Sequence, residues 1–226
     1  MRIRARYSVG PDLRFLGNFD MMHVMERALR RAGIAYALSE GFNPHIKLSM
    51  GTVLPVGIWG KGEFFDLELE TGTVEDFVLR INQVLPEGMH VDECREIMDQ
   101  TPSLMKAVNA AAYTFAINQS LPAVENKVKE ILSSSELPVQ SRGKKKDKVK
   151  DVRPGIFSIR TVLQENALVE ITMLVSVNEP LNVRFDELLE LLDRFGIDRA
   201  EVLDFYRETN YIKKDNKFYS PLEKVS

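Results

Sequence analysis

The sequence predicts an α+β fold made of two tandem ferredoxin-like units. Each half of the 226-residue chain repeats strand and helix signals in the order β-α-β-β-α-β, which is the order of that fold. The strand segments alternate apolar and polar residues, and the helical segments carry apolar stripes at a 3.6-residue period. We expect an N-terminal unit at residues 1–100, a second unit at 111–208 and a polar tail at 209–226.

The first unit begins with a strand at 2–9, in which arginines alternate with apolar residues and therefore share one face. Asn18 is the candidate N-cap of a helix at 19–32 that stops at Gly33. Its predicted buried stripe comprises Met22, Met25, Leu29 and Ala32. The remaining predicted elements are strands near 34–38, 46–53, 63–70 and 89–97, and a helix capped by Thr73.

The second unit follows a connector at 98–110 and repeats the pattern. A helix opens at Ser120 and Pro122, where a polar cap precedes a proline near the first helical position. A basic loop at 142–153 interrupts the strands. The predicted strands are 113–117, 137–141, 157–163, 167–175 and 199–207, and the second helix spans 183–195.

Composition excludes several classes of site. A single cysteine, Cys94, rules out an internal disulfide framework and a self-contained iron–sulfur cluster, which needs several thiolates. Three histidines make a histidine-rich metal site improbable, and no catalytic signature motif is present, so we expect no metal and no cofactor. Without an apolar run of membrane length or a secretory N-terminus, we expect a cytoplasmic protein that does not bind membranes.

The charge is unevenly spread along a chain whose net charge is −3. Residues 1–50 hold 8 Lys/Arg against 4 Asp/Glu, and residues 142–153 hold 7 against 2, whereas residues 51–141 hold 6 against 14. Two basic islands in an acidic protein indicate localised anion-binding faces. The alternative is that both islands are ordinary solvated surface.

The loop between the predicted strands at 34–38 and 46–53 is the strongest candidate site. Ser39, Asn43, His45 and Lys47 could together bind an anionic or nucleotide ligand, with Gly41 and Pro44 setting the backbone. Alternatively, Asn-Pro is simply a turn and His45 a surface residue.

The helix before this loop has a basic outer face with Arg27, Arg30 and Arg31, which could grip phosphates bidentately. We expect these arginines to lie close to the arginines of the 2–9 strand. The alternative is a solvated face with Glu26 as partner. In the second basic island, Lys144, Lys145 and Lys146 could bind polyanions nonspecifically or only improve solubility.

Several stretches resemble the radical SAM-linked protein family, uncharacterised bacterial proteins encoded beside, or fused to, a radical S-adenosylmethionine enzyme. They are residues 14–20 (RFLGNFD), 26–33 (ERALRRAG), 39–45 (SEGFNPH), 103–105 (SLM) and 150–154 (KDVRP). The resemblance implies a radical SAM enzyme as partner, which would carry the cluster. It also hints at RNA, because family members often lie near ribonuclease E/G and ribosomal-protein genes. Where the family commonly has Ser-His, this chain has Gly17 and Asn18, which favours binding over catalysis.

Three functional hypotheses follow. The first is an RNA-binding accessory protein, not an enzyme by itself, that presents tRNA or rRNA to a radical SAM modifying enzyme. The second is a metal-independent RNA-processing endoribonuclease with His45 as the candidate general acid–base. The third is a protein–protein adaptor that makes no RNA contact and docks its partner through the acidic segment at 61–76.

Overall fold

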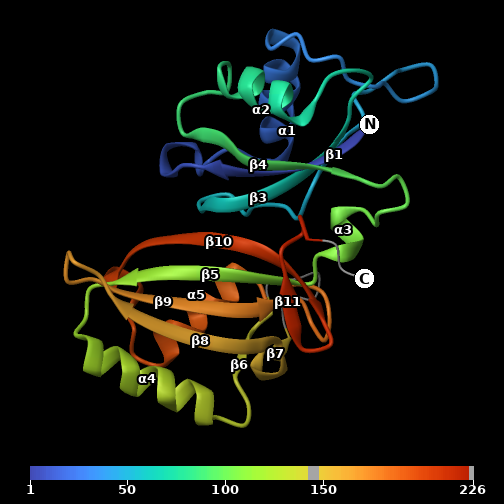
Figure 1. The fold of residues 1–226 in the computed structure, drawn as a ribbon. Coiled ribbons are helices and arrows are strands. Elements are labelled where there is room, and N and C mark those ends of the chain that lie inside the picture. Colours follow the sequence, from blue (N-terminus) through green and yellow to red (C-terminus); the bar gives the residue numbers. More distant parts are fainter. Residues whose placement is uncertain (142–147, 224–226) are drawn as a thin grey trace. The chain divides into compact units, whose positions relative to one another are not determined.

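A computed structural model describes residues 1–141 and 148–223. The chain forms two compact units, Met1–Val108 with Thr209–Ser226, and Asn109–Glu208 (Figure 1). Each unit combines strands with a few helices, and antiparallel pairing dominates the described strands. The protein is therefore a mixed α/β fold, as the sequence predicts. The finer assignment to ferredoxin-like units stays a prediction.

Unit 1 contains a small antiparallel sheet with two longer helices. Its elements are β1 (Arg2–Val9), a 3-10 turn (Pro11–Leu13), α1 (Asn18–Arg31), β2 (Leu48–Met50), β3 (Trp59–Glu68), α2 (Val74–Asn82), β4 (Met89–Ile97), α3 (Leu104–Ala107), the end of β10 (Val202–Lys214) and β11 (Lys217–Tyr219). The strand order is β4-β1-β3, with β2 also paired to β3. All three of these pairings are antiparallel.

The core of unit 1 lies between the sheet and its helices. The apolar residues of β1 occupy alternate positions, as the two-residue period of a strand requires, and are buried. They pack with apolar residues of α1, β3 and α2 into one cluster that includes Ile3, Tyr7, Met25, Leu29, Phe65, Phe77 and Ile81. The other face of β1 carries its arginines.

Unit 2 has the strand order β10-β5-β9-β8 and a separate hairpin of β6 and β7. Its elements are β5 (Ala110–Ile117), α4 (Leu121–Ser133), β6 (Pro138–Gln140), β7 (Val149–Asp151), β8 (Ile156–Leu163), β9 (Val169–Ser176), α5 (Phe185–Arg194) and the first part of β10, with 3-10 turns at Arg153–Gly155 and Arg199–Glu201. Phe115 of β5 stacks on Phe185 of α5, with ring centroids 5.8 Å apart. This contact holds α5 on the sheet.

α1 begins one residue earlier than the sequence indicates. Gly17, not Asn18, is the N-cap, and the Gly17 N–H donates to the Asp20 carboxylate at 3.1 Å. This contact supports a helix start at Gly17, because the Asp20 carboxylate satisfies the backbone N–H of the N-cap residue, as in one half of a capping box. The buried residues of α1 are Met21, Met25, Ala28 and Leu29, so the predictions of Met25 and Leu29 are confirmed, whereas Met22 and Ala32 are only half-buried.

The segment at 209–223 is part of unit 1. β10 continues to Lys214, past the predicted end at 207. Thr209 Oγ1 donates to Gly62 O at 3.2 Å, and Arg4 Nη1 donates to Pro221 O at 3.2 Å. These residues are polar in sequence, yet their hydrogen bonds join them to β1 and β3.

Candidate nucleic-acid interface

The loop at 39–45 is a closed hairpin. Leu38 and Ile46 form a β-bridge at its base. The Ser39 N–H donates to His45 O at 2.8 Å, and the His45 N–H donates to Ser39 Oγ at 3.0 Å. Gly41 has φ of 123° with open space around it, so its backbone conformation, not crowding, requires glycine. Ser39 therefore holds the loop in shape.

The tip of this hairpin presents side chains to solvent. Phe42 is fully exposed, with a relative accessible surface of 106%. Asn43 and His45 are also exposed, and neither side chain makes a hydrogen bond or ion pair with any residue in the described ranges. Figure 1 shows the loop projecting from unit 1. Phe42 is not among the predicted site residues, although an aromatic ring between Gly41 and Asn43 in a polar loop is a signal for such a role.

Lys47 lies just beyond the hairpin and is already paired. Its Nζ is 2.7 Å from Glu68 Oε2, and both side chains are partly exposed. The hydrogen bond and charge of Glu68 raise the pKa of Lys47. Because this pair is solvated, it is weak, and a phosphate could compete for the ammonium group.

The three arginines of α1 differ in their contacts. Arg27 is exposed and makes no ion pair or hydrogen bond with any described residue. Arg30 is 3.8 Å from Glu26, and 58% of its side chain is exposed. Arg31 Nη2 donates to Val84 O at 2.7 Å, after the end of α2. The structure therefore leaves Arg27 and Arg30 available, whereas Arg31 ties α1 to the segment that follows α2.

A further arginine, Arg80 of α2, caps the C-terminus of α1. Its Nη2 donates to Ala32 O at 2.5 Å and to Gly33 O at 2.6 Å, and its Nη1 lies 3.1 Å from Asp76. A cation at the end of a helix satisfies free carbonyls and complements the helix dipole. Arg31 and Arg80 thus join the two helices in both directions.

The arginines of β1 do not join those of α1, so the expectation of one shared cluster is wrong. Asp66 of β3 accepts from Arg2 Nη2 at 2.6 Å and from Arg4 Nε at 2.7 Å. Arg4 is 1% exposed and also donates to the carbonyls of Pro102 and Pro221. Successive residues of a strand face opposite sides of the sheet. Because the apolar residues of β1 face α1, its arginines lie on the opposite face of the sheet.

The acidic segment at 61–76 is largely internal. Glu63 and Asp66 are buried, and Asn210 Nδ2 donates to Glu63 Oε2 at 3.4 Å. Asp66 is neutralised by its two arginines. Only the later carboxylates of this segment, such as Glu70 and Glu75, face solvent.

The second basic island is only partly described. Lys144, Lys145 and Lys146 lie outside the described residues. Lys150 Nζ is 2.6 Å from the fully buried Glu187 of α5. Arg153 donates to three backbone carbonyls, those of Leu132, Ser134 and Ile156. Lys150 and Arg153 therefore make internal contacts within unit 2.

Other site types find little support in the described ranges. No group of three or more His, Cys, Asp or Glu side chains there could hold a metal ion. Burial raises the pKa of the Cys94 thiol to about 12, so this cysteine is a poor nucleophile. Across residues 1–141 and 148–223, no helix has the length and apolar character that a membrane span requires.

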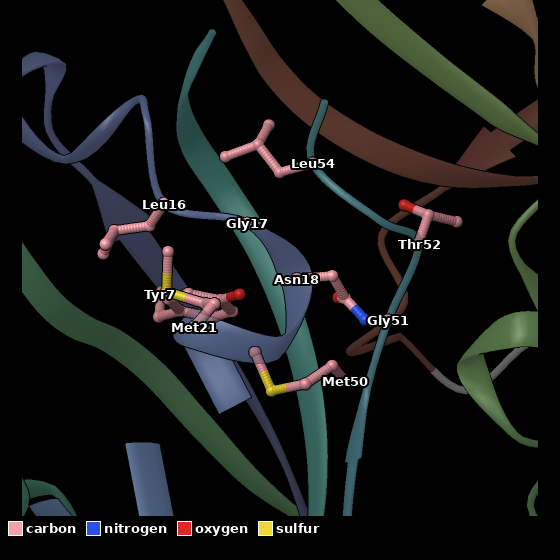
Figure 2. Close-up of a pocket in the computed structure, with 9 residues that line it drawn as sticks. All are labelled: Tyr7, Leu16, Gly17, Asn18, Met21, Met50, Gly51, Thr52 and Leu54. Atoms are coloured by element: carbon pink, nitrogen blue, oxygen red, sulfur yellow. The ribbon is translucent and has the colours of Figure 1, made fainter. Parts of the chain in front are cut away.

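A small hollow lies at the start of α1 (Figure 2). Gly17 and Asn18 line it together with Tyr7, Met50 and Leu54. Its volume of about 20 Å³ is enough for one water molecule and too small for a nucleotide base. Gly17 and Asn18 therefore face a space that cannot enclose a substrate in this conformation.

Residues 2–185 match the family described as uncharacterised proteins conserved in bacteria (DUF2344), so the chain belongs to that family. Among curated proteins, none matches the chain. A crystal structure of a Cbf5–Nop10–Gar1 complex is similar at 11% identity with a TM-score of 0.43, over 92% of this chain and 47% of that chain. This chain thus spans about half of that one. A candidate glycine cleavage system transcriptional repressor is similar at 12% identity with a TM-score of 0.24, over 86% of this chain and 88% of that chain. Both scores are too low to support an argument about fold or function.

Proposed function

We propose that this protein is a cytoplasmic RNA-binding accessory protein that presents tRNA or rRNA to a radical SAM modifying enzyme. The observation that carries the proposal is a set of exposed polar side chains on α1 and on the hairpin that follows it in the chain. Arg27 and Arg30 precede the 39–45 hairpin, whose Asn43 and His45 have no polar partner among the described side chains. Arg30 has only a long contact with Glu26, and exposed groups with few internal partners can bind an external ligand.

The chemistry of these groups suits RNA. Guanidinium groups bind phosphate oxygens, and RNA binding by basic residues releases counterions. Asn43 and His45 can donate to and accept from a base edge or a ribose hydroxyl. No described side chain hydrogen-bonds to the His45 ring, so His45 lacks the orienting partner that activates a general base. This favours binding over cleavage.

We further infer that both units are ferredoxin-like. The strand orders β4-β1-β3-β2 and β10-β5-β9-β8, each with two helices between strands, support that assignment. Such sheets serve RNA-binding modules, although the fold hosts many functions. The radical SAM partner rests on the resemblance of residues 14–20 and 39–45, and on a chain with one half-buried cysteine, which cannot ligate its own cluster.

The test is RNA binding by a double charge reversal. Arg27→Glu with Arg30→Glu should weaken binding of the protein to tRNA or rRNA fragments at least tenfold. The slope of log Kd against log salt concentration should also fall by about one to two. Each lost phosphate contact lowers this slope by roughly 0.7–0.9. Fluorescence anisotropy across a salt series measures both.

The matched control is Arg194→Glu with Arg199→Glu, which makes the same charge change at two exposed arginines of unit 2 that have no partner among the described residues. We expect it to keep most of the affinity. Equal loss in both pairs would indicate only a nonspecific charge effect. Unchanged binding in the Arg27/Arg30 pair would overturn the proposal. UV crosslinking in cells then identifies the RNA, and background-level RNA recovery would favour the adaptor hypothesis.

A further inference from the structure

We propose that Phe42 is a base-stacking residue and that the 39–45 hairpin takes an unpaired nucleotide. The inference rests on the proposed function and names the class of RNA that this site selects. It starts from one observation: the phenyl ring at the loop tip is fully exposed, although an apolar ring gains free energy from burial. Isolated exposed apolar residues are common, so exposure alone does not carry the proposal.

The hairpin that bears Phe42 is held in one shape. Two hydrogen bonds join Ser39 and His45, and the Leu38–Ile46 bridge closes the base. Gly41 turns the backbone at a positive φ, and Pro44 restricts the other side of the tip. A ring presented by a preorganised loop loses little conformational entropy when it meets a ligand.

The neighbours of the ring point to a nucleotide and not to an apolar protein surface. Asn43 follows Phe42 directly and His45 lies three residues farther on, both exposed and without a side-chain partner among the described residues, and Lys47 follows with a solvated ion pair. Protein hot spots instead place an aromatic ring among other apolar side chains that exclude water. A flat ring beside hydrogen-bonding groups is the arrangement that stacks one face of a base and reads its edge.

The same geometry selects an unpaired base. In a duplex, each base already stacks on both neighbours, so no face is free for Phe42. The major groove of A-form RNA is also too narrow for side chains to read. A loop, a bulge or a single strand offers the required face. Stacking is tolerant of base identity, because every base has a π-face.

The first experiment compares affinities for a mixed-sequence single-stranded oligoribonucleotide and for its annealed duplex. The wild-type protein should prefer the single strand, and Phe42→Ala should lose about tenfold in affinity for it, as typical base stacking requires. Phe42→Trp should keep or increase that affinity. Phe42→Leu should behave like Phe42→Ala, because leucine keeps apolar area without a flat ring.

The matched control is Phe19→Ala. Phe19 is an exposed phenylalanine of the same unit, with a relative accessible surface of 75%, and it lies in the first turn of α1. Arg31 ends this 14-residue helix about 18 Å along the axis from Phe19, and the hairpin begins only at Ser39, farther along the chain. We expect Phe19→Ala to bind single-stranded RNA as the wild type does.

A direct readout uses the single tryptophan of the chain, Trp59. Trp59→Phe combined with Phe42→Trp places the only indole at the loop tip. Its fluorescence should be quenched by the single strand and much less by the duplex, because a stacked base quenches indole emission. Trp59→Phe alone measures any effect of the background substitution on binding.

The outcomes separate two failures. If the wild type binds neither RNA form, the proposed function fails. If it binds RNA but Phe42→Ala changes nothing, or Phe42→Leu retains full affinity, the stacking proposal fails while RNA binding stands. Loss in both Phe42→Ala and Phe42→Leu, retention in Phe42→Trp and selective quenching would support the proposal.

Discussion

Two sets of arginines in unit 1 have opposite environments. Arg2 and Arg4 of β1 share the carboxylate of Asp66, and Arg4 is almost fully buried. Arg27 and Arg30 of α1 are exposed, and their one ion pair is a long contact with Glu26. Both sets appear in the sequence as closely spaced arginines. Close spacing of arginines in the sequence therefore does not by itself identify an anion-binding surface.

The physical difference is the cost of desolvation. A buried guanidinium needs enough partners to replace water, and Arg4 has a carboxylate and two carbonyls. Its charge is therefore neutralised inside the protein. The exposed arginines of α1 keep their hydration and can exchange water for an external phosphate. Substitutions of the two sets should therefore differ in their effect on the free energy of unfolding.

The largest expected effect follows removal of a buried arginine. Arg4→Ala deletes the bonds to Oδ1 and Oδ2 of Asp66 and leaves the carbonyls of Pro102 and Pro221 without this donor. We expect the free energy of unfolding to fall by about 3 kcal/mol or more, the range found when one partner of a buried pair is lost. Urea denaturation followed by Trp59 fluorescence measures this, because Trp59 lies at the start of β3 in unit 1.

Arg6→Ala is the control on the same strand. Arg6 makes one hydrogen bond, to Lys61 O at 3.3 Å. We expect its loss to cost less than about 1 kcal/mol. A small effect for Arg4→Ala would mean that the buried ion pair contributes little net stability.

The thiol of Cys94 provides an independent probe of the same sheet, since Cys94 on β4 lies opposite Ala5 of β1. Burial is the largest cause that raises its pKa, from 9.0 to about 12. At pH 8 the folded protein should react with a disulfide reagent about a thousandfold more slowly than the unfolded chain. The thiolate fraction of the folded protein should rise about tenfold per pH unit between pH 8 and 10. A plateau in the labelling rate near pH 9 would show that the thiol is not buried as described.

An intermediate effect is expected at Arg80, which donates to Ala32 O and Gly33 O at the end of α1. Arg80→Ala should lower the free energy of unfolding by about 1–3 kcal/mol, because these carbonyls lose a charged donor. Hydrogen exchange should show faster opening of the last turn of α1. Arg80→Lys is the control, since it keeps the charge near the helix terminus but cannot span both carbonyls. Equal stability of Arg80→Ala and wild type would contradict the capping role.

Much of the fold could be predicted because its signals are local. The arginine face of β1 follows from strand alternation, and the Thr73 cap is confirmed by its hydrogen bond from the Asp76 N–H. The start of α1 was displaced by one residue because the Asp20 side chain, and not Asn18, decides the cap. In place of the strand predicted near 34–38, the structure has two isolated bridges, Tyr36 with Leu69 and Leu38 with Ile46.

The candidate site was less predictable, because availability depends on long-range partners. Arg31 and Lys47 look equivalent to Arg27 in sequence, but Val84 and Glu68 engage them across the fold. The Ser39 hydroxyl accepts from the His45 N–H and so supports the hairpin. The sequence alone does not distinguish this structural role of Ser39 from a role in ligand binding. The sequence shows an aromatic residue in a polar loop at Phe42. Its full exposure could not be predicted, because exposure depends on how the hairpin tip projects from the unit.

The smallest effect on stability is expected for the exposed arginines of α1. Arg27→Ala with Arg30→Ala should change the free energy of unfolding by at most about 0.5 kcal/mol, because surface substitutions away from buried contacts have effects of that size. The 3.8 Å pair with Glu26 contributes little in solvent. Urea denaturation tests the stability, and RNA binding is measured on the same preparation. An unfolding cost comparable to that of Arg4→Ala would show that these arginines are structural. In that case their loss could not be used as evidence for an RNA contact, and the distinction between the two arginine sets would fail.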